Sequence, residues 1–428
     1  MSGSRSSKLS HPSRASMPGA ALALSALLCA SLTACGGGGG GGGHSHAPHP
    51  APPVQPAPPP PPVNLGPLYD FTPIGLPGIN YGVVDRQGIA NGGLVTGSSW
   101  DASGIVRAFL YNGKTNIDLG TFGGANARAF AVNRCGQVTG WGQTAAGIPH
   151  AFFYDGTLHD LGTLGGGESW GASISTCGKV AGWSTVPGSP RHAFYYDGKS
   201  MRDLGTLGGQ ISEALDVNAA GQVVGTSTIT GENVLHAFLY DARTGAPLLD
   251  LNPPGFSSQA IDINEAGQVA ISARDPVVDG LLRAFRYSGG VLQDLGMLPD
   301  TNGSVPHAIN DAGHVVGYVY SDAGQVAFVH DGTSMRSLGT LNGGRFSDAN
   351  AINASGLIVG QAVNGNTGPE HAVAWGPEYG LVDLNTRVKD LPAGVVLLEA
   401  EAVADDGAIA VRTSAGLGLL RPRKDDGK

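Results

Sequence analysis

Residues 192–225 read HAFYYDGKSMRDLGTLGGQISEALDVNAAGQVVG, and residues 150–183 read HAFFYDGTLHDLGTLGGGESWGASISTCGKVAGW. The two stretches are the same pattern one period apart. The glycine before the Val-rich run returns eight times, from Gly93 to Gly407. The phenylalanine of the pattern recurs, with Val373 in the same register, at Phe109, Phe152, Phe194, Phe238, Phe285 and Phe328. A period near 42–46 residues predicts a protein built from repeated supersecondary units.

Each repeat reads as four short strands. The first ends in a triplet such as 308–310 (Ala-Ile-Asn) and turns through Gly313 into a second, Val-rich strand. The third is His-Ala-Phe with two further large residues, and an Asp-Gly pair such as 197–198 leads into the fourth, Asp-Leu-Gly-Thr-Leu. Asp-Gly between such flanks is a strong hairpin signal, because type I′ turns need positive φ at both central residues. Four-stranded units of this length are typical of the blades of a β-propeller.

The number of blades follows from the length of the repeated region. Residues 64–428 number 365, and eight blades of about 45 residues need about 360. Residues 68–74 resemble a fourth strand without a third before it, while the last repeat offers strands at 399–403, 408–411 and 418–421 but no fourth. We therefore expect eight blades, with the N-terminal strand completing the last one. Seven blades is the alternative if the degenerate ends do not form strands.

Composition agrees with an all-β chain rich in turns. Glycine accounts for 69 of 428 residues, but apolar residues still reach 41%, which is too many for a disordered chain. Charged residues are only 14%, against about 25% in ordinary domains. The charged heptads of helical bundles are therefore missing, and a β-rich fold is expected.

The N-terminal segment predicts export. Residues 1–34 hold Arg5, Lys8 and Arg14 and then a short apolar run, which is typical of a secretory signal peptide. The run ends in Leu-Thr-Ala-Cys at 32–35, which resembles a bacterial lipobox with Cys35 as the lipidated residue. Residues 35–63 are rich in glycine and proline and are expected to form a disordered stalk below a propeller at 64–428. We expect a lipid-anchored envelope protein at the outer membrane, facing the periplasm or the cell surface.

The repeat also points to a family. The in-register His-Ala-Phe, the Asp-Leu-Gly-Thr-Leu-Gly-Gly and the Asn-x-x-Gly-Gln-Val-Val-Gly blocks resemble the HAF-repeat family of bacterial extracellular proteins. The resemblance covers essentially the whole repeated region. It implies no activity and no catalytic residues, because that family is named for its repeat.

Polar residues that recur in register are predicted to be scaffold. A histidine or arginine begins the third strand and an aspartate stands in the fourth, and such repeated pairs suit a hydrogen-bonded network inside or between blades. The residues are His150, His192, His236, His371, Arg107 and Arg283, with Asp118, Asp160, Asp203, Asp250, Asp294 and Asp383. Ser169 lies in a G-x-S-x-G match, but Ser212 and Ser347 share its register, so we interpret it as a repeat residue rather than a nucleophile.

A binding site is expected among the residues that differ between repeats. Loops between second and third strands vary most, and variable loops on a rigid scaffold commonly carry binding. The candidate contacts are Trp100, Asp101, Trp141, Trp183, Arg191 and Tyr318. Cys135 and Cys177 occupy equivalent turns of successive repeats and either form a disulfide or stay free.

The net charge and the motifs limit the classes of function that the sequence supports. Removing residues 1–34 leaves 22 basic and 34 acidic residues, a net charge of −12, which argues against nucleic acid as a partner. No catalytic residue, cofactor or metal site is predicted, and a monomer is expected. The first interpretation is a non-catalytic binding or scaffold propeller for a protein or glycan partner. The alternatives are an extracytoplasmic carbohydrate lyase or hydrolase with its site at the channel mouth, and a structural spacer or adhesin element.

Overall fold

The computed structural model describes residues 66–76, 81–231, 234–275 and 281–423. The predicted signal peptide, lipidation site Cys35 and stalk lie outside these residues. The chain divides into two units after residue 61, and all the described residues belong to the second unit, Pro62–Lys428. No helix in the described part of the chain is long and apolar enough to cross a membrane.

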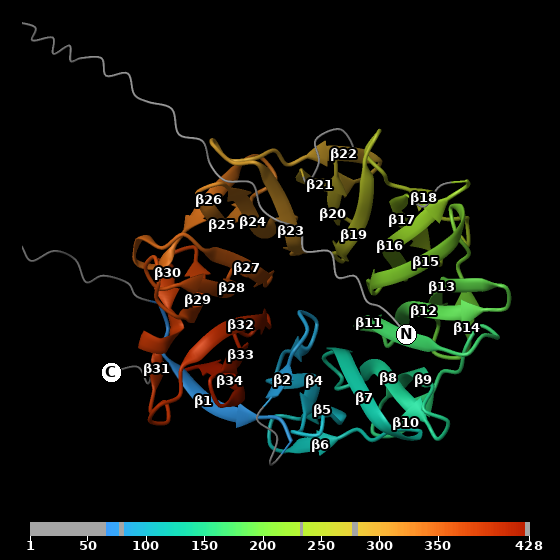
Figure 1. The fold of residues 1–428 in the computed structure, drawn as a ribbon, viewed down its shortest axis with the longest axis horizontal. Helices are drawn as coiled ribbons and strands as arrows, with labels where there is room; N and C mark the ends of the chain where they lie inside the picture. Colours follow the sequence, from blue (N-terminus) through green and yellow to red (C-terminus); the bar gives the residue numbers. More distant parts are fainter. Residues whose placement is uncertain (1–65, 77–80, 232–233, 276–280, 424–428) are drawn as a thin grey trace, which may run out of the picture. The chain divides into compact units, whose positions relative to one another are not determined.

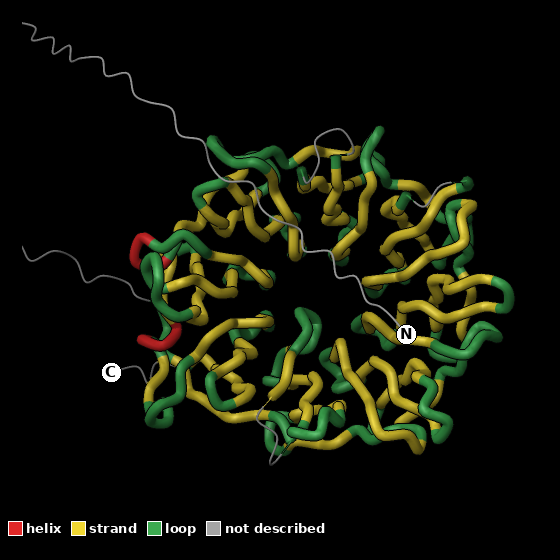
Figure 2. Tube along the Cα trace, viewed as in Figure 1, coloured by secondary structure: helices red, strands yellow, loops and turns green. Residues whose placement is uncertain are grey.

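Largely antiparallel four-stranded units follow one another along the chain, and each contains one copy of the repeat. Figure 1 shows these units standing around a common centre, and Figure 2 shows that strands and loops make up nearly all of the described chain. Two short 3-10 turns are the helical elements of the described residues. The first sheet contains β2 (Tyr81–Val83), β3 (Ile89–Ala90), β4 (Leu94–Trp100), β5 (Val106–Tyr111) and β6 (Asn116–Asp118). The second contains β7 (Gly123–Val132), β8 (Val138–Thr144), β9 (Pro149–Tyr154) and β10 (Leu158–Asp160).

The next two units share one sheet through a single parallel pair, Arg191 with Ile211. They are β11 (Ser169–Ile174), β12 (Val180–Val186), β13 (Ser189–Tyr196) and β14 (Met201–Asp203), then β15 (Gly208–Val217), β16 (Gln222–Ile229), β17 (Leu235–Asp241) and β18 (Leu249–Asp250). Two four-stranded sheets follow: β19 (Ser257–Ile263), β20 (Val269–Arg274), β21 (Leu282–Ser288) and β22 (Val291–Asp294), then β23 (Gly303–Ile309), β24 (Val315–Ser321), β25 (Gly324–His330) and β26 (Met335–Gly339).

The last sheets hold both ends of the described chain. After the turn η1 (Leu341–Gly343) come β27 (Ser347–Ile352), β28 (Ile358–Val363), β29 (Glu370–Gly376) and β30 (Gly380–Asp383). After η2 (Leu384–Thr386) the final sheet has the order β31 (Val388–Lys389), β1 (Tyr69–Ile74), β34 (Gly416–Pro422), β33 (Ile409–Thr413) and β32 (Leu397–Val403). β1 pairs antiparallel with β34 from Tyr69 opposite Pro422 to Ile74 opposite Leu417.

The hairpins form at the predicted positions, but the Asp-Gly turn is not of type I′, because Gly198 has positive φ and Asp197 does not. The Asn218 carboxamide oxygen accepts the backbone N–H of Gln222 at 3.0 Å, and Gly221 has φ of +78°. In the other hairpin, the Asp197 carboxylate accepts the N–H groups of Lys199 and Ser200, and Gly198 has φ of +95°. Positive φ is accessible to glycine without steric cost, which explains why glycine recurs at these positions.

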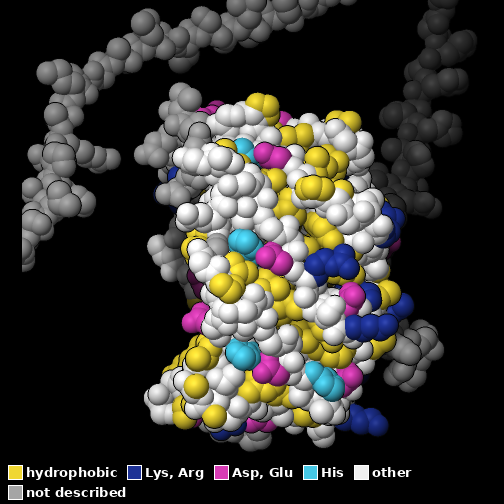
Figure 3. Space-filling view, turned by 90° about the vertical axis from the view of Figure 1, so that its right-hand side faces the viewer, with side chains coloured by type: hydrophobic (Ala, Val, Ile, Leu, Met, Phe, Trp, Pro, Cys, Tyr) yellow, Lys and Arg dark blue, Asp and Glu magenta, His cyan; other side chains and the backbone are white. Residues whose placement is uncertain are grey.

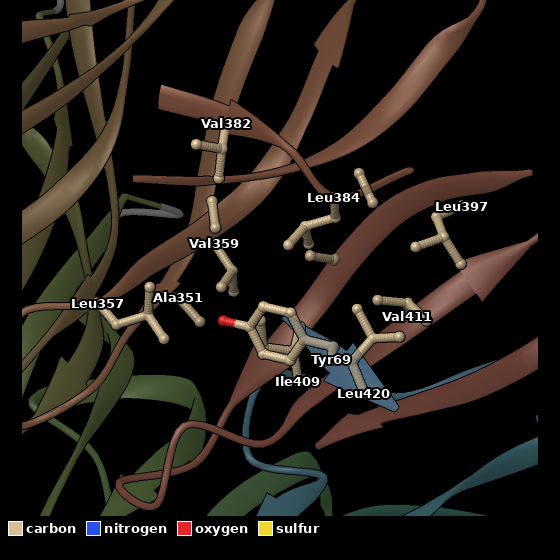
Figure 4. Close-up of a cluster of buried hydrophobic side chains, with 13 residues drawn as sticks. Tyr69, Ala351, Leu357, Val359, Val382, Leu384, Leu397, Ile409, Val411 and Leu420 are labelled. Atoms are coloured by element: carbon tan, nitrogen blue, oxygen red, sulfur yellow. The ribbon is translucent and has the colours of Figure 1, made fainter. Parts of the chain in front are cut away.

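Apolar side chains are buried between neighbouring sheets. One core cluster packs Phe238 and Val223 against Ala181 and Tyr195 of the preceding repeat. Figure 4 shows another, in which Tyr69 of β1 lies among Leu384, Leu397 and Leu420. Each sheet therefore covers the apolar face of the next, and burial of this surface is the main force that holds the units together.

Hydrogen bonds between neighbouring repeats fix how one repeat is positioned on the next. Ser212 Oγ accepts the N–H of Ala193, the alanine of His-Ala-Phe in the preceding repeat, at 2.8 Å. Ser169, Ser258, Ser304 and Ser347 make the same contact in other repeats. Near the turns, the carboxamide of Asn218 donates to the carbonyl of Asn264, and that of Asn264 donates to the carbonyl of Asn310. The register of each sheet on the next is therefore fixed by buried polar contacts.

Candidate active site at the channel mouth

The first strand of each repeat lines a central channel that contains two cavities. The turn-side cavity, of about 400 Å³, is surrounded by the turn residues of the inner strands, among them Asn133, Asn218, Asn264, Asn310 and Asn353. The mouth cavity, of about 550 Å³, lies further from these turns and is lined by Asp85, Arg86, Trp170, Glu213 and His307, among others. Gln87, Asp262, Ile352 and Val403 line both cavities, so the two adjoin at these residues.

The mouth is where the repeats stop being alike. One register position of the inner strand is paired with a residue of the second strand in every repeat from β7 onward, and these pairs are chemically different. They are Arg128–Trp141, Trp170–Trp183, Glu213–Thr226, Gln259–Ser272, Val305–Tyr318, Asp348–Gln361 and Glu399–Arg412. The turn side repeats the same asparagine, so chemical asymmetry is concentrated at the mouth.

Glu401 is a strongly perturbed carboxyl group beside the mouth. It is 7% exposed and accepts the N–H of Val84 at 3.0 Å. Burial raises its pKa from 4.5 to about 8, an effect that the neighbouring Glu399 increases and the hydrogen bond to Val84 opposes. Desolvation disfavours the charged form of a carboxyl group, so Glu401 is protonated at neutral pH. A protonated carboxyl group of this kind can donate a proton.

Asp85 and Glu401 line the same side cavity, of about 390 Å³, next to the mouth. Burial also raises the pKa of Asp85, but Arg128 opposes this shift because its Nη2 lies 3.5 Å from Asp85 Oδ2. Glu399 is held by Arg412, 2.7 Å away. The two carboxyl groups thus have different environments: Glu401 is next to other carboxylates, and Asp85 is next to a guanidinium group. Different environments are what separate the roles of acid and base in a carboxyl pair.

Arg86 connects opposite parts of the channel wall. Its Nη1 donates to the carbonyl of His307 on β23 at 2.6 Å, and it lines both the mouth cavity and the side cavity. Burial lowers the pKa of this guanidinium group, while Asp262, Asp348 and Asp85 raise it. His307 Nδ1 lies 3.2 Å from the Asp348 carboxylate, and its ring meets Tyr318 edge-on at 5.3 Å.

Asp216 and Asp262, by contrast, belong to the scaffold. Asp216 accepts hydrogen bonds from Gln87 Nε2 at 2.6 Å and Ser173 Oγ at 2.7 Å, and from Ile263 N of the next repeat at 3.0 Å. Asp262 accepts the equivalent N–H, that of Ile309, at 2.9 Å. Burial and then the Asp216 charge raise the pKa of Asp262, so the pair retains a proton. Repetition of the same backbone contact indicates a lock between repeats.

Aromatic residues make the opposite side of the mouth. The ring centroids of Trp141 and Trp170 are 5.3 Å apart, as are those of Trp170 and Trp183, and Phe130 lies 6.0 Å from Trp170. Arg191 lies over Trp183 at 5.2 Å and is ion-paired with Glu213. We call Phe130, Trp170 and Trp183, which line the mouth cavity, the aromatic wall.

The predicted binding residues divide into two groups. Trp183 lines the mouth cavity with Arg191 over it, Trp141 packs against the neighbouring Trp170, and Tyr318 lies beside His307. Trp100 stacks on Tyr81 and lines the side cavity. Asp101 instead accepts hydrogen bonds from Ser103 and Ile105 and so shapes its own loop.

The repeated His/Arg and Asp residues pair within each sheet. His150 meets Asp160 and His192 meets Asp203, both at 2.9 Å, and the same contact is made by His236 with Asp250, His371 with Asp383, Arg107 with Asp118, and Arg283 with Asp294. Figure 3 shows histidine side chains beside acidic ones along one side of the unit. None of these pairs lines the mouth cavity.

Ser169 and the cysteines have no catalytic arrangement. Ser169 is fully buried, and its Oγ accepts the N–H of Ala151. Cys135 and Cys177 are both exposed and free, so the disulfide alternative is wrong for this structure.

Sequence reasoning missed the acidic half of the site: Asp85, Arg86, Glu213, His307 and Glu401. A signal was present. When the repeats are aligned on their turn glycines, one inner-strand position varies between repeats, whereas the position after it is mostly alanine; the varying residues are Asp85, Arg128, Trp170, Glu213, Gln259, Val305, Asp348 and Glu399. The mouth is therefore indicated by a position that varies within otherwise similar inner strands, and not by the variable loops.

Comparison with known proteins supplies similarity of fold only. No family model matches the chain, and no curated protein matches it in sequence. Among solved structures it is similar to the β-propeller domain of the trilobed protease from Pyrococcus furiosus, with a TM-score of 0.49 and 11% identity over 73% of this chain and all of that one. It is also similar to dipeptidyl peptidase 4 of Porphyromonas gingivalis (TM-score 0.48, 12% identity, 81% of this chain) and to a puromycin-hydrolyzing peptidase of Mycobacterium tuberculosis (TM-score 0.47, 13% identity, 76% of this chain). The chain spans about three fifths of these two peptidases.

The interpretation as a non-catalytic binding or scaffold propeller is wrong. The solved propellers above are parts of peptidases, although at such identity the likeness concerns the fold alone. Within this chain, the asymmetric residues converge in the channel rather than on the loops, and they include carboxyl groups with raised pKa values. Convergent carboxyl groups with perturbed pKa values are typical of an active site, which favours the enzymatic alternative.

Proposed function

We propose that the channel mouth is the active site of a carbohydrate hydrolase, with Glu401 as general acid and Asp85 as general base. The observation that carries this proposal is the shared side cavity, which holds a buried Glu401 whose pKa is raised to about 8 and an Asp85 that lies next to Arg128. Burial raises the pKa of Asp85 as well, and Arg128 opposes that shift. Paired carboxyl groups with different protonation states are what cleavage of a glycosidic bond requires.

The reaction balances with these two groups and water. Glu401 gives its proton to the glycosidic oxygen as the bond to the anomeric carbon breaks. Asp85 takes a proton from a water molecule, whose oxygen bonds to that carbon. Glu401 ends as a carboxylate and Asp85 as an acid, and proton exchange with solvent restores both. Among the described residues that line the mouth and side cavities there is no serine, threonine or cysteine, so carboxyl chemistry is favoured over a hydroxyl or thiol nucleophile.

The test uses isosteric variants on a panel of polysaccharides with reducing-end detection. Glu401→Gln and Asp85→Asn are expected to lower kcat/KM by about 10²–10⁴-fold, the usual contribution of general acid or base catalysis. Glu378→Gln, at an exposed position away from the cavities, is the matched control. Full activity of both site variants on a cleaved substrate, or cleavage of no glycan by the wild type, would overturn the proposal.

We also infer that eight units form the ring and that β1 closes it. In support, one core cluster joins Val95 and Phe109 of the first sheet to Ala410 and Leu419 of the last. Gly92 N donates to the Asp406 carboxylate of the last repeat at 2.7 Å. The first and last sheets therefore pack as other neighbours do, and the mouth is enclosed on all sides.

The sequence also bears on where in the cell this protein is located. We propose that the chain is a monomeric envelope lipoprotein, anchored through Cys35 and related to HAF-repeat proteins. A glycan substrate suits such a location. In a bacterial host, Cys35→Ala is expected to move the protein from the membrane fraction to the soluble one, and unchanged membrane partition would contradict the anchor.

A further inference from the structure

The lining of the mouth cavity combines apolar and charged residues. Phe130, Trp170, Leu215 and Ile261 supply apolar surface from consecutive inner strands. Asp85, Arg86, Glu213 and His307 supply charged and polar groups. A pyranose ring has the same division, because its C–H groups form apolar patches and its hydroxyl groups surround the ring. A planar indole matches such an apolar patch in size and shape, and aromatic rings provide large, rigid contact area.

We propose that the aromatic wall is the subsite that binds a neutral pyranose unit of the substrate, an inference that rests on the proposed function. Trp183 is its principal contact. It is partly buried and lines the cavity; Trp170 packs against its ring at 5.3 Å and Arg191 lies over the ring at 5.2 Å, so a sugar would meet the part of the indole that these two residues leave uncovered. Arg191 and Glu213, paired beside Trp183, offer a donor and an acceptor to sugar hydroxyl groups.

The charge balance of the mouth selects a neutral sugar over a uronate. Arg86 faces three carboxylates, those of Asp262, Asp348 and Asp85. Each of the other guanidinium groups there is paired with a carboxylate: Arg128 with Asp85, Arg191 with Glu213 and Arg412 with Glu399. No guanidinium group among the described mouth residues therefore lacks an acidic partner, and the net charge of −9 repels an anionic polymer.

The experiment measures binding separately from cleavage. The full chain carrying Glu401→Gln is titrated with neutral hexasaccharides of glucose, mannose, galactose and xylose, with hexamers of polygalacturonate and alginate, and with a casein digest. Calorimetry gives the affinity. Tryptophan fluorescence gives a second readout, because the Trp141–Trp170–Trp183 stack holds three of the five tryptophans in the chain.

We expect a neutral oligosaccharide to bind and to change the fluorescence. Adding Trp183→Ala is expected to weaken binding at least about tenfold, whereas Trp183→Phe, which keeps an aromatic face, stays within about threefold. Circular dichroism and melting of each variant establish that it is folded, and if Trp183→Ala is not, Arg191→Ala serves in its place, with an expected loss of about threefold or more.

Preferred binding of the uronate hexamers, binding of casein peptides alone, or equal affinity of the folded Trp183→Ala and Trp183→Phe variants would overturn the subsite. The proposed function fails independently. If neutral glycans bind in a Trp183-dependent way but the wild type never cleaves them, the subsite stands without the catalytic pair. If glycans are cleaved without dependence on Trp183, the catalytic pair stands without the subsite.

Discussion

Tyr69 offers the sharpest test of ring closure. It begins β1, is 1% exposed, and packs against Leu384, Leu397 and Leu420 between the last two sheets (Figure 4). Replacing it with alanine removes most of a buried aromatic side chain. If about 150 Å² of apolar surface is no longer buried, at about 25 cal/mol per Å², the free energy of unfolding falls by about 4 kcal/mol. Large-to-small changes of aromatic core residues give about 3–5 kcal/mol, which agrees.

This loss converts into a measurable melting shift. A unit of about 360 residues has an unfolding entropy near 0.75 kcal/mol/K, so 4 kcal/mol corresponds to a fall in Tm of about 5 °C. Scanning calorimetry and urea denaturation of Tyr69→Ala provide the two measurements. Tyr81→Ala is the matched control, because Tyr81 is 61% exposed and the same chemical change there costs little. If Tyr69→Ala melts within about 1 °C of the Tyr81→Ala control, β1 does not stabilise the last sheet and does not close the ring.

Three further predictions concern a titrating group, a repeat contact and the thiols. The pKa of Glu401 is about 8 in the folded state and about 4.5 in the unfolded state, so the folded state binds the extra proton between these values. The free energy of unfolding, measured by urea denaturation, should therefore fall as pH rises from about 5 to above 8, and Glu401→Gln should reduce this dependence on pH. Ser212→Ala leaves the buried N–H of Ala193 without its acceptor and should lower the free energy of unfolding, measured by urea denaturation, by about 1–3 kcal/mol. The control Ser200→Ala, at an exposed position, should lower it by less than about 0.5 kcal/mol, and equal losses would contradict a stabilising Ser212–Ala193 hydrogen bond. Peptides containing Cys135 and Cys177 should be alkylated without prior reduction in mass spectrometry, and a linked pair of these peptides would contradict the free thiols.

The local features of this chain were predictable because each is encoded within a few residues. Asp-Gly and Asn-x-x-Gly turns fix the hairpins through positive φ and side-chain acceptors, as at Asp197 and Asn218. The role of Ser169 was also predictable, because a residue that recurs in register performs the same contact in each repeat.

Which of the variable inner-strand residues meet one another was not predictable, since these residues are distant in sequence and meet only when the sheets come together. Val84 and Glu401 are 317 positions apart and become hydrogen-bonded partners across the first and last sheets. The raised pKa of Glu401 depends on burial by both ends of the chain, a property that no local motif carries.

The sequence alone therefore determined the repeat, its strands and its turns, because short-range hydrogen bonds and alternating burial decide these. Tertiary structure decided where the chemistry lies. The inner strands surround one channel, so side chains from equivalent positions of different repeats meet there. Their burial from solvent shifts the pKa values of the carboxyl groups among them. Residues that are uniform along the chain became scaffold, and residues that differ at one register position became the candidate site.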